Sequence, residues 1–177
     1  KRFGSFSRAL AANPEALAEI DGMGDASIVA LKTVQAAALL MQQQDLSQKP
    51  VLSSWKSVLD YCHSAMAHET IEQFRLLFLD GKNALIADEV QSQGTVNHTP
   101  VYVREVAKRA LALDASAVIM AHNHPTGDPS PSRDDIEMTK QVKAALEKIG
   151  IQLHDHIIIG RKGHASLRSL GYLDGAK

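Results

Sequence analysis

The sequence pattern of residues 115–150 predicts a buried strand, a rigid turn and a helix in direct succession. The apolar run "ASAVIM" at residues 115–120 suits a short strand in the interior of a protein. The helix-period spacing of apolar residues after Ser132 predicts a helix that stops before Gly150. The loop between them, "PTGDPSPS", carries three prolines, which stiffen it and lower the entropic cost of ordering it. The end of the strand and the start of the helix should therefore lie close together.

Two histidines end this strand and an aspartate begins the helix. His122 and His124 stand at positions i and i+2, so a strand that continues through them places both imidazoles on one face. Pro125 then ends the strand, because proline cannot donate to a ladder. Ser132 suits the N-cap of the helix, and Asp135 lies in its first turn. The spacing predicts that two imidazoles and one carboxylate converge on one point.

This set of side chains matches the protein ligands of a catalytic zinc ion, whose fourth position is left to a water with its pKa lowered to about 7. A structural interpretation competes with it. Ser132 and Asp135 match a capping box, and the helix dipole stabilises an acidic residue near a helix N-terminus. Capping explains neither histidine, however, and strand propensity favours neither. The occurrence of both histidines together with the capping-box residues therefore favours a metal site.

The segment "HNHPTGDPSPSRDD" resembles the JAMM (MPN+) metalloprotease motif, which reads His, any residue, His, seven residues, Ser, two residues, Asp. His122, His124, Ser132 and Asp135 fit this motif without a gap. The chain resembles RadC-type proteins still more closely, in which a JAMM domain follows a small helical domain. The stretches that carry this wider resemblance are "FRLLFLDGKNALI", "VREVAKRAL", "DHIIIG" and "SLRSLGYL".

The resemblance implies a fold and a chemistry. The implied fold is mixed α/β, with a central mixed sheet flanked by helices (JAMM/MPN, cytidine-deaminase-like) and a small all-α helix-hairpin-helix domain before it. The implied chemistry is zinc-dependent hydrolysis, in which a metal-bound water attacks an amide or isopeptide carbonyl of an unknown peptide or protein substrate. His122, His124 and Asp135 would be the Zn²⁺ ligands, and Ser132 would help to orient or stabilise an oxyanion.

The same resemblance implies a glutamate on an earlier segment that acts as general base. Glu72 fits best, because it stands just before the strand-like "FRLLFLD". Glu69 is a near neighbour, and Glu105 in "VREV" is a rival. A solvated glutamate at a helix end is the structural alternative for Glu72.

A second His-x-His pair, His154 and His156, lies in "LHDHIIIG". Its spacing also predicts two imidazoles on one strand face. No carboxylate at a helix start follows it, since the next residues, "RKGH", are basic. We therefore interpret both histidines as sheet residues, with Asp155 or His156 lying near the metal site in a supporting position.

The whole chain predicts three parts. Ala- and Leu-rich stretches with helical spacing indicate a helix-hairpin-helix domain over residues 1–46. Polar residues and Pro50 indicate a linker over 47–53, and residues 54–177 form the JAMM/MPN+ RadC-like domain. The further elements expected are a helix capped by Asn13 with Pro14 at its first position, a helix beginning near Ser54, a hairpin turning near Asp80–Gly81, a helix over 102–113 and a strand over 151–160.

The N-terminal segment "LAEIDGMGDASIVALKTV" resembles a helix-hairpin-helix, a motif that contacts DNA without reading its sequence. Gly22 and Gly24 would allow the tight turn and expose backbone N–H groups to a phosphate. Charge predicts a weak contact, because Asp21 and Asp25 flank the glycines and the five basic and five acidic residues of 1–50 cancel. A plain helical hairpin or a protein-docking role is the alternative.

Composition limits the classes of protein that this chain can belong to. With 45% hydrophobic and 22% charged residues it is an ordinary globular protein. Its net charge of −1 differs from the clearly positive charge that is typical of nucleic-acid-binding proteins. No apolar run approaches the roughly 20 residues of a membrane span, and no signal-peptide pattern opens the sequence. The single cysteine, Cys62, fits a reducing compartment. We expect a cytoplasmic protein without membrane contact.

Two other functions are compatible with these patterns. A metal-dependent DNA-processing or DNA-repair-associated protein would use the helix-hairpin-helix for DNA contact. A non-catalytic module would hold zinc only to support an interaction. No pattern in the sequence marks a specificity pocket or an oligomeric state.

Overall fold

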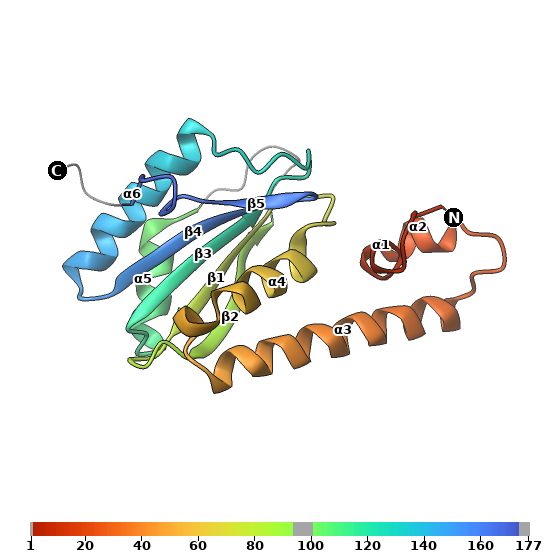
Figure 1. Cartoon of the computed structure of the whole chain (residues 1–177), viewed down its shortest axis with the longest axis horizontal. Coiled ribbons are helices and arrows are strands. Elements are labelled where there is room, and N and C mark those ends of the chain that lie inside the picture. The colour runs from red at the N-terminus through yellow and green to blue at the C-terminus, as the bar shows by residue number, and fades with distance from the viewer. Residues whose placement is uncertain (1, 94–100, 174–177) are drawn as a thin grey trace.

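A mixed sheet with helices on both faces forms the body of the protein (Figure 1). The structure is a computed structural model that describes residues 2–93 and 101–173. In these residues the strands lie in the order β2 (Leu85–Gln93), β1 (Gln73–Leu79), β3 (Ala117–Asn123), β4 (Gln152–Gly160) and β5 (Gly163–Ser166). The β3–β4 pair is parallel and the other pairs are antiparallel. The predicted mixed α/β fold with a central mixed sheet is confirmed, and so is the predicted hairpin, formed by β1 and β2.

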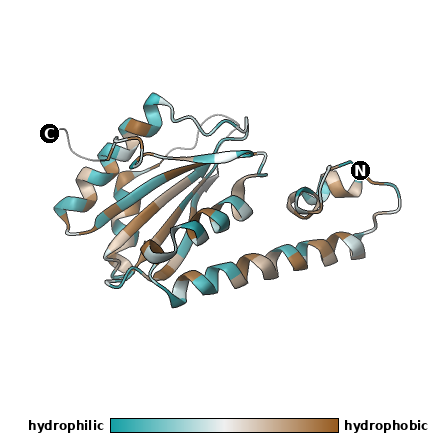
Figure 2. Cartoon of the chain, viewed as in Figure 1, coloured by the Kyte–Doolittle hydropathy of each residue, from teal (hydrophilic) through white to brown (hydrophobic). Residues whose placement is uncertain are grey.

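Two apolar cores lie on opposite faces of this sheet. On one face, α4 (Trp55–Met66) packs against side chains of β1, β3 and β4 that include Leu77, Ile119 and Ile157. On the other face, α5 (Val103–Ala112) and α6 (Arg133–Lys148) pack against a set that includes Phe74, Met120 and Ile158. Strands that are covered on both faces should be apolar along their whole length. Figure 2 shows hydrophobic residues running through the central strands accordingly.

The parallel connection from β3 through α6 to β4 determines where a site can form. Parallel neighbours need a crossover, and here α6 makes it, so the chain leaves the carboxyl end of β3 and enters α6 at the same end of the sheet. Side chains at the end of a strand and at the start of the next helix then face one another. This is the end of an α/β sheet at which ligands generally bind.

The N-terminal region is helical, as the sequence predicts. The helices α1 (Phe6–Ala11) and α2 (Pro14–Ala18) pack against α3 (Asp25–Gln48), whose later turns contact α4 and β2. Asn13 caps α2, because its Oδ1 accepts a hydrogen bond of 2.9 Å from the backbone N of Ala16. The predicted cap with Pro14 at the first helical position is confirmed.

The helix α3 runs further than the sequence pattern indicated. It continues to Gln48, inside the predicted linker, and a 3₁₀ turn at Val51–Ser54 (η1) follows. Glutamine and leucine are good helix formers, so the polar residues before Pro50 do not end the helix. The proline does, since it disfavours helical geometry at the residue before it. The predicted domain boundaries at 46 and 54 stay a prediction. None of the helices in the described residues is both long and apolar enough to cross a membrane.

A buried ion pair ties the β1–β2 hairpin to α4. Arg75 on β1 and Asp88 on β2 approach to 2.5 Å, with side chains only 14% and 2% exposed. Tyr61 of α4 donates its hydroxyl hydrogen to the same carboxylate, and Arg75 also donates to Gln73 Oε1 at 3.1 Å. Removing one member of such a pair leaves the other charge buried without a partner, which is strongly destabilising.

We therefore expect the Asp88→Asn substitution, which keeps the shape and removes the charge, to lower the free energy of unfolding by about 3–5 kcal/mol. The matched control is Asp60→Asn, which breaks the exposed pair of Lys56 and Asp60 on α4 and should cost about 0.5 kcal/mol or less. Urea unfolding of both variants measures the difference. Equal losses of unfolding free energy in the two variants would show that the buried pair of Arg75 and Asp88 stabilises the fold no more than an exposed pair does.

Candidate metal centre

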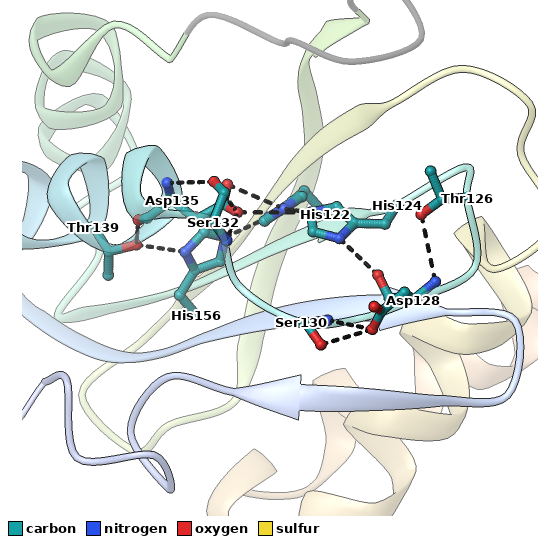
Figure 3. Close-up of polar contacts among 9 residues, drawn as sticks. All are labelled: His122, His124, Thr126, Asp128, Ser130, Ser132, Asp135, Thr139 and His156. Carbon is teal, nitrogen blue, oxygen red and sulfur yellow. Dashed lines mark hydrogen bonds and ion pairs between the residues drawn. The ribbon is translucent and has the colours of Figure 1, made fainter.

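The predicted His–His–Asp cluster assembles where β3 ends and α6 begins (Figure 3). His122 is buried in β3, His124 follows the last residue of the strand, and Asp135 lies in the first turn of α6. The Nε2 atoms of the two imidazoles are 2.9 Å apart. Asp135 Oδ1 lies 3.3 Å from His122 Nε2, and its Oδ2 lies 3.6 Å from His124 Nε2. Three metal-ligating side chains thus converge on one point.

These separations fit a divalent cation between the three side chains. Tetrahedral zinc binds nitrogen and oxygen at about 2.0–2.2 Å, so its ligand atoms lie roughly 3.3 Å from one another. The observed distances of 2.9, 3.3 and 3.6 Å scatter around that value. Among the described residues, His122, His124 and Asp135 form the group of side chains that could hold a metal ion. Nitrogen and carboxylate donors suit several divalent metals, and the geometry alone does not select among them.

The capping box and the cluster are compatible, because they use the same carboxylate. Asp135 Oδ2 accepts hydrogen bonds from the backbone N of Ser132 at 2.8 Å and from its Oγ at 2.6 Å. The backbone N of Asp135 donates in return to Ser132 Oγ at 3.1 Å. The helix cap therefore fixes the rotamer that aims the Asp135 carboxylate at the imidazoles. The capping box predicted for Ser132 and Asp135 is present, and it also orients the carboxylate of the cluster.

Burial and neighbouring charges set the protonation of the three side chains. Burial lowers the pKa of His122 to about 4, so its imidazole is neutral at pH 7. Burial acts to raise the pKa of Asp135, but the hydrogen bond with His124, the charge of His122 and the bonds from Ser132 hold it well below its usual range. The hydrogen bond to Asp135 is the largest cause that raises the pKa of His124. A neutral imidazole and an ionised carboxylate are the forms that bind metals.

The proline-rich loop holds His124 by a hydrogen bond to the backbone. His124 Nδ1 lies 2.8 Å from the carbonyl oxygen of Asp128, which can only accept, so Nδ1 carries a hydrogen and the neutral ring presents its Nε2 lone pair to the cluster. Asp128 is itself fixed by Ser130, whose N and Oγ donate to its carboxylate at 3.0 and 2.7 Å (Figure 3). The loop packs on β4 at Gly160, where a Cβ would lie 2.4 Å from the carbonyl oxygen of Gly127.

The three candidate glutamates lie in different surroundings. Glu72 directly precedes β1, is partly buried, and contributes to the raised pKa of His124 after the stronger effect of Asp135. Phe74 pairs with His122 in the antiparallel β1–β3 register, and Glu72 stands two residues before Phe74, just outside the paired part of β1. Glu69 is exposed, and Glu105 is exposed on α5 at 3.8 Å from Lys108. Of the three, Glu72 is the one beside the cluster.

The second His-x-His pair does not lie on one strand face, and this prediction is wrong. The β3–β4 register shifts between the Val118–Leu153 and Ile119–Asp155 pairs, so a bulge at His154 interrupts the alternation of side chains. His154 Nε2 lies 2.6 Å from Asn83 Oδ1, in the turn between β1 and β2.

His156 alone of that pair reaches the cluster. It is completely buried, and its Nε2 lies 2.7 Å from His122 Nδ1. Asp155 bonds instead to Ser166 and to the backbone of Arg168. Thr139, whose hydroxyl contacts His156, was not predicted. Its one sequence signal is that it follows Asp135 by a single helical turn.

The predicted DNA-contact glycines lie in the turn between α2 and α3. Gly22 adopts a positive φ of 78°, which explains a glycine at this point of a tight turn. Gly24 is the N-cap of α3 and offers no side chain to the first N–H groups of that helix. The turn joins two helices as the sequence predicts, and contact with DNA stays a prediction.

A mixed sheet flanked by helices, with two histidines and an aspartate gathered at the end of a central strand, defines a JAB-type domain, the kind that JAMM metal-dependent hydrolases share. Residues 52–172 match the family described as RadC-like JAB domain. This chain belongs to the RadC family. It is 57% identical to a UPF0758 protein of Rhodobacter capsulatus over an alignment of 171 residues. That alignment covers 97% of this chain and 80% of the relative. It is also 55% identical to a UPF0758 protein of Ruegeria pomeroyi over an alignment of 171 residues, which covers 97% of this chain and 76% of that protein.

Proposed function

We propose that this protein is a zinc-dependent hydrolase of the JAMM type that cleaves an amide or isopeptide bond in a peptide or protein. The observation that carries the proposal is the His–His–Asp cluster, with Glu72 near enough to His124 for its charge to raise the pKa of that imidazole, after the larger effect of Asp135. Three ligands, an accessible fourth position and a carboxylate beside it are the parts that metal-assisted hydrolysis requires. Zinc is proposed because two imidazoles and one carboxylate in a tetrahedral arrangement are its usual catalytic ligands.

A divalent cation at this point would lower the pKa of a water molecule and polarise a carbonyl oxygen. The roles of the protein's own groups follow from their positions. Glu72 takes the proton of the attacking water and then delivers it to the leaving amine. Asp135 stays in place through the bond from the backbone N of Ser132. His124 is held by the loop and His122 by His156. Ser132 is exposed at the start of α6, and its hydroxyl, turned from Asp135 toward the substrate, donates a hydrogen bond to the developing oxyanion.

The test is hydrolysis by the full chain of a fluorogenic peptide library and an isopeptide-linked dipeptide, with DNA as a third substrate. We expect amide cleavage that a zinc chelator abolishes and added Zn²⁺ restores, because the metal held by the cluster would activate the attacking water. Cleavage of DNA alone would replace this proposal by the DNA-processing alternative. Stoichiometric zinc without cleavage of any substrate would make the protein a non-catalytic zinc-holding module.

The surroundings of the reaction form a second part of the proposal. We place the protein in the cytoplasm, since its one cysteine, Cys62, can form no internal disulfide, which fits a reducing compartment. Weak contact with DNA through Gly22 and Gly24 is compatible with the uncapped start of α3, but Asp21 and Asp25 oppose it.

A further inference from the structure

A chain of short hydrogen bonds runs from Thr139 on α6 through His156 on β4 to His122 of the cluster (Figure 3). The hydroxyl of Thr139 donates to the backbone carbonyl of Asp135 at 2.5 Å. The same hydroxyl lies 2.6 Å from His156 Nδ1. His156 Nε2 lies 2.7 Å from His122 Nδ1. The chain thus begins at the backbone of one candidate ligand and ends on the ring of another.

The position of every hydrogen in this chain follows from its first member. A carbonyl oxygen can only accept, so the one hydroxyl hydrogen of Thr139 points at Asp135. The hydroxyl oxygen must then accept from His156, which makes Nδ1 the protonated nitrogen of that ring. His156 is completely buried between two neutral partners, where a charged ring would be costly, so its Nε2 accepts. The hydrogen between the two rings therefore belongs to His122 Nδ1.

We propose that Thr139 and His156 are positioning residues that hold His122 in its Nδ1–H tautomer, so that its Nε2 lone pair faces the metal site. The inference rests on the metal site of the proposed function and not on hydrolysis. In the part of the chain that the structure describes, the partner of His122 Nδ1 is an imidazole and not a carbonyl or carboxylate, and this imidazole stands between it and the Thr139 hydroxyl. Partners of this kind commonly raise metal affinity by about 10- to 100-fold.

The same assignment explains the close approach of the two candidate ligands. The loop carbonyl of Asp128 leaves His124 Nε2 without a hydrogen, and the chain through His156 leaves His122 Nε2 without one. Two lone pairs 2.9 Å apart, beside an ionised Asp135, repel each other unless a proton on His124 Nε2 or a metal cation lies between the rings. Two separate hydrogen-bond systems, one on the loop and one inside the domain, thus prepare one site for a positive ion.

The first experiment compares zinc affinities by competition with a chromophoric chelator. Thr139→Val removes the hydroxyl, so His156 loses the acceptor that fixes its tautomer, and we expect the Kd for Zn²⁺ to rise about 10- to 100-fold. Thr139→Ser keeps the hydroxyl and should restore the affinity of the unsubstituted chain. The matched control is Thr33→Val, because Thr33 makes the same bond to the carbonyl four residues earlier, at 2.8 Å, in the distant α3. Unchanged affinity in Thr139→Val would overturn the proposal.

The second experiment needs no substitution. Nitrogen-15 NMR of the zinc-loaded full chain reports which ring nitrogens of the histidines carry hydrogen. We expect His156 and His122 both to be protonated at Nδ1, and a merely structural Thr139 would not require this. A hydrogen on Nε2 of His156 would overturn the proposal even if Thr139→Val failed to fold. A chain that holds zinc in this way but cleaves nothing would refute the proposed hydrolysis and leave this inference intact.

Discussion

The His122→Ala variant should purify with almost no zinc, whereas the unsubstituted chain should hold about one ion per molecule. His122 is the most buried of the three candidate ligands, and its neutral imidazole needs to release no proton to bind a metal. Without it, His124 and Asp135 remain as two ligands on a partly open site, which is too few for tight binding. Elemental analysis of the purified protein measures the change, and hydrolysis should be lost with the metal.

His164→Ala is the control for this substitution, because His164 is an exposed histidine on β5 and should leave the zinc content unchanged. Since His122 is packed against His156, circular dichroism must show that the variant is folded. Asp135→Asn gives an independent result, as it keeps a side chain able to accept from Ser132 and removes the charged ligand. Full zinc content in folded His122→Ala and in Asp135→Asn would refute the ligand assignment.

The Glu72→Gln variant should keep its zinc and lose most of its activity. An amide cannot take a proton from water, so we expect kcat to fall by about 10²- to 10⁴-fold, the usual contribution of a general base. Because Glu72 is not one of the three clustered ligands, its removal should not change the metal content. The measurement is kcat/KM together with zinc per chain on the same preparation.

Glu69→Gln and Glu105→Gln are the matched controls, since both residues are exposed and were rivals for the same role. Each should hydrolyse amides at the rate of the unsubstituted chain. Full activity of Glu72→Gln, or a large loss in Glu105→Gln alone, would assign the base elsewhere.

The local parts of the fold were predictable because their signals lie within a few residues. The strand before His122, the stiff loop and the helix capped by Ser132 all follow from short-range patterns, and the structure contains each of them. The hairpin of β1 and β2 was predictable for the same reason. The end of α3 was not, because polar residues of high helix propensity look like a linker until the proline stops the helix.

The sequence by itself determined the meeting of His122, His124 and Asp135, since fourteen consecutive residues contain all three and strand, turn and cap geometry direct them to one point. The tertiary structure alone decided which distant groups join them. Glu72, just before β1, lies near enough to His124 for its charge to act on that imidazole. The bulge at His154 turns that ring toward Asn83, while His156 reaches His122. Register and bulges depend on pairing between segments far apart in the chain, which the periodicity of one segment cannot reveal.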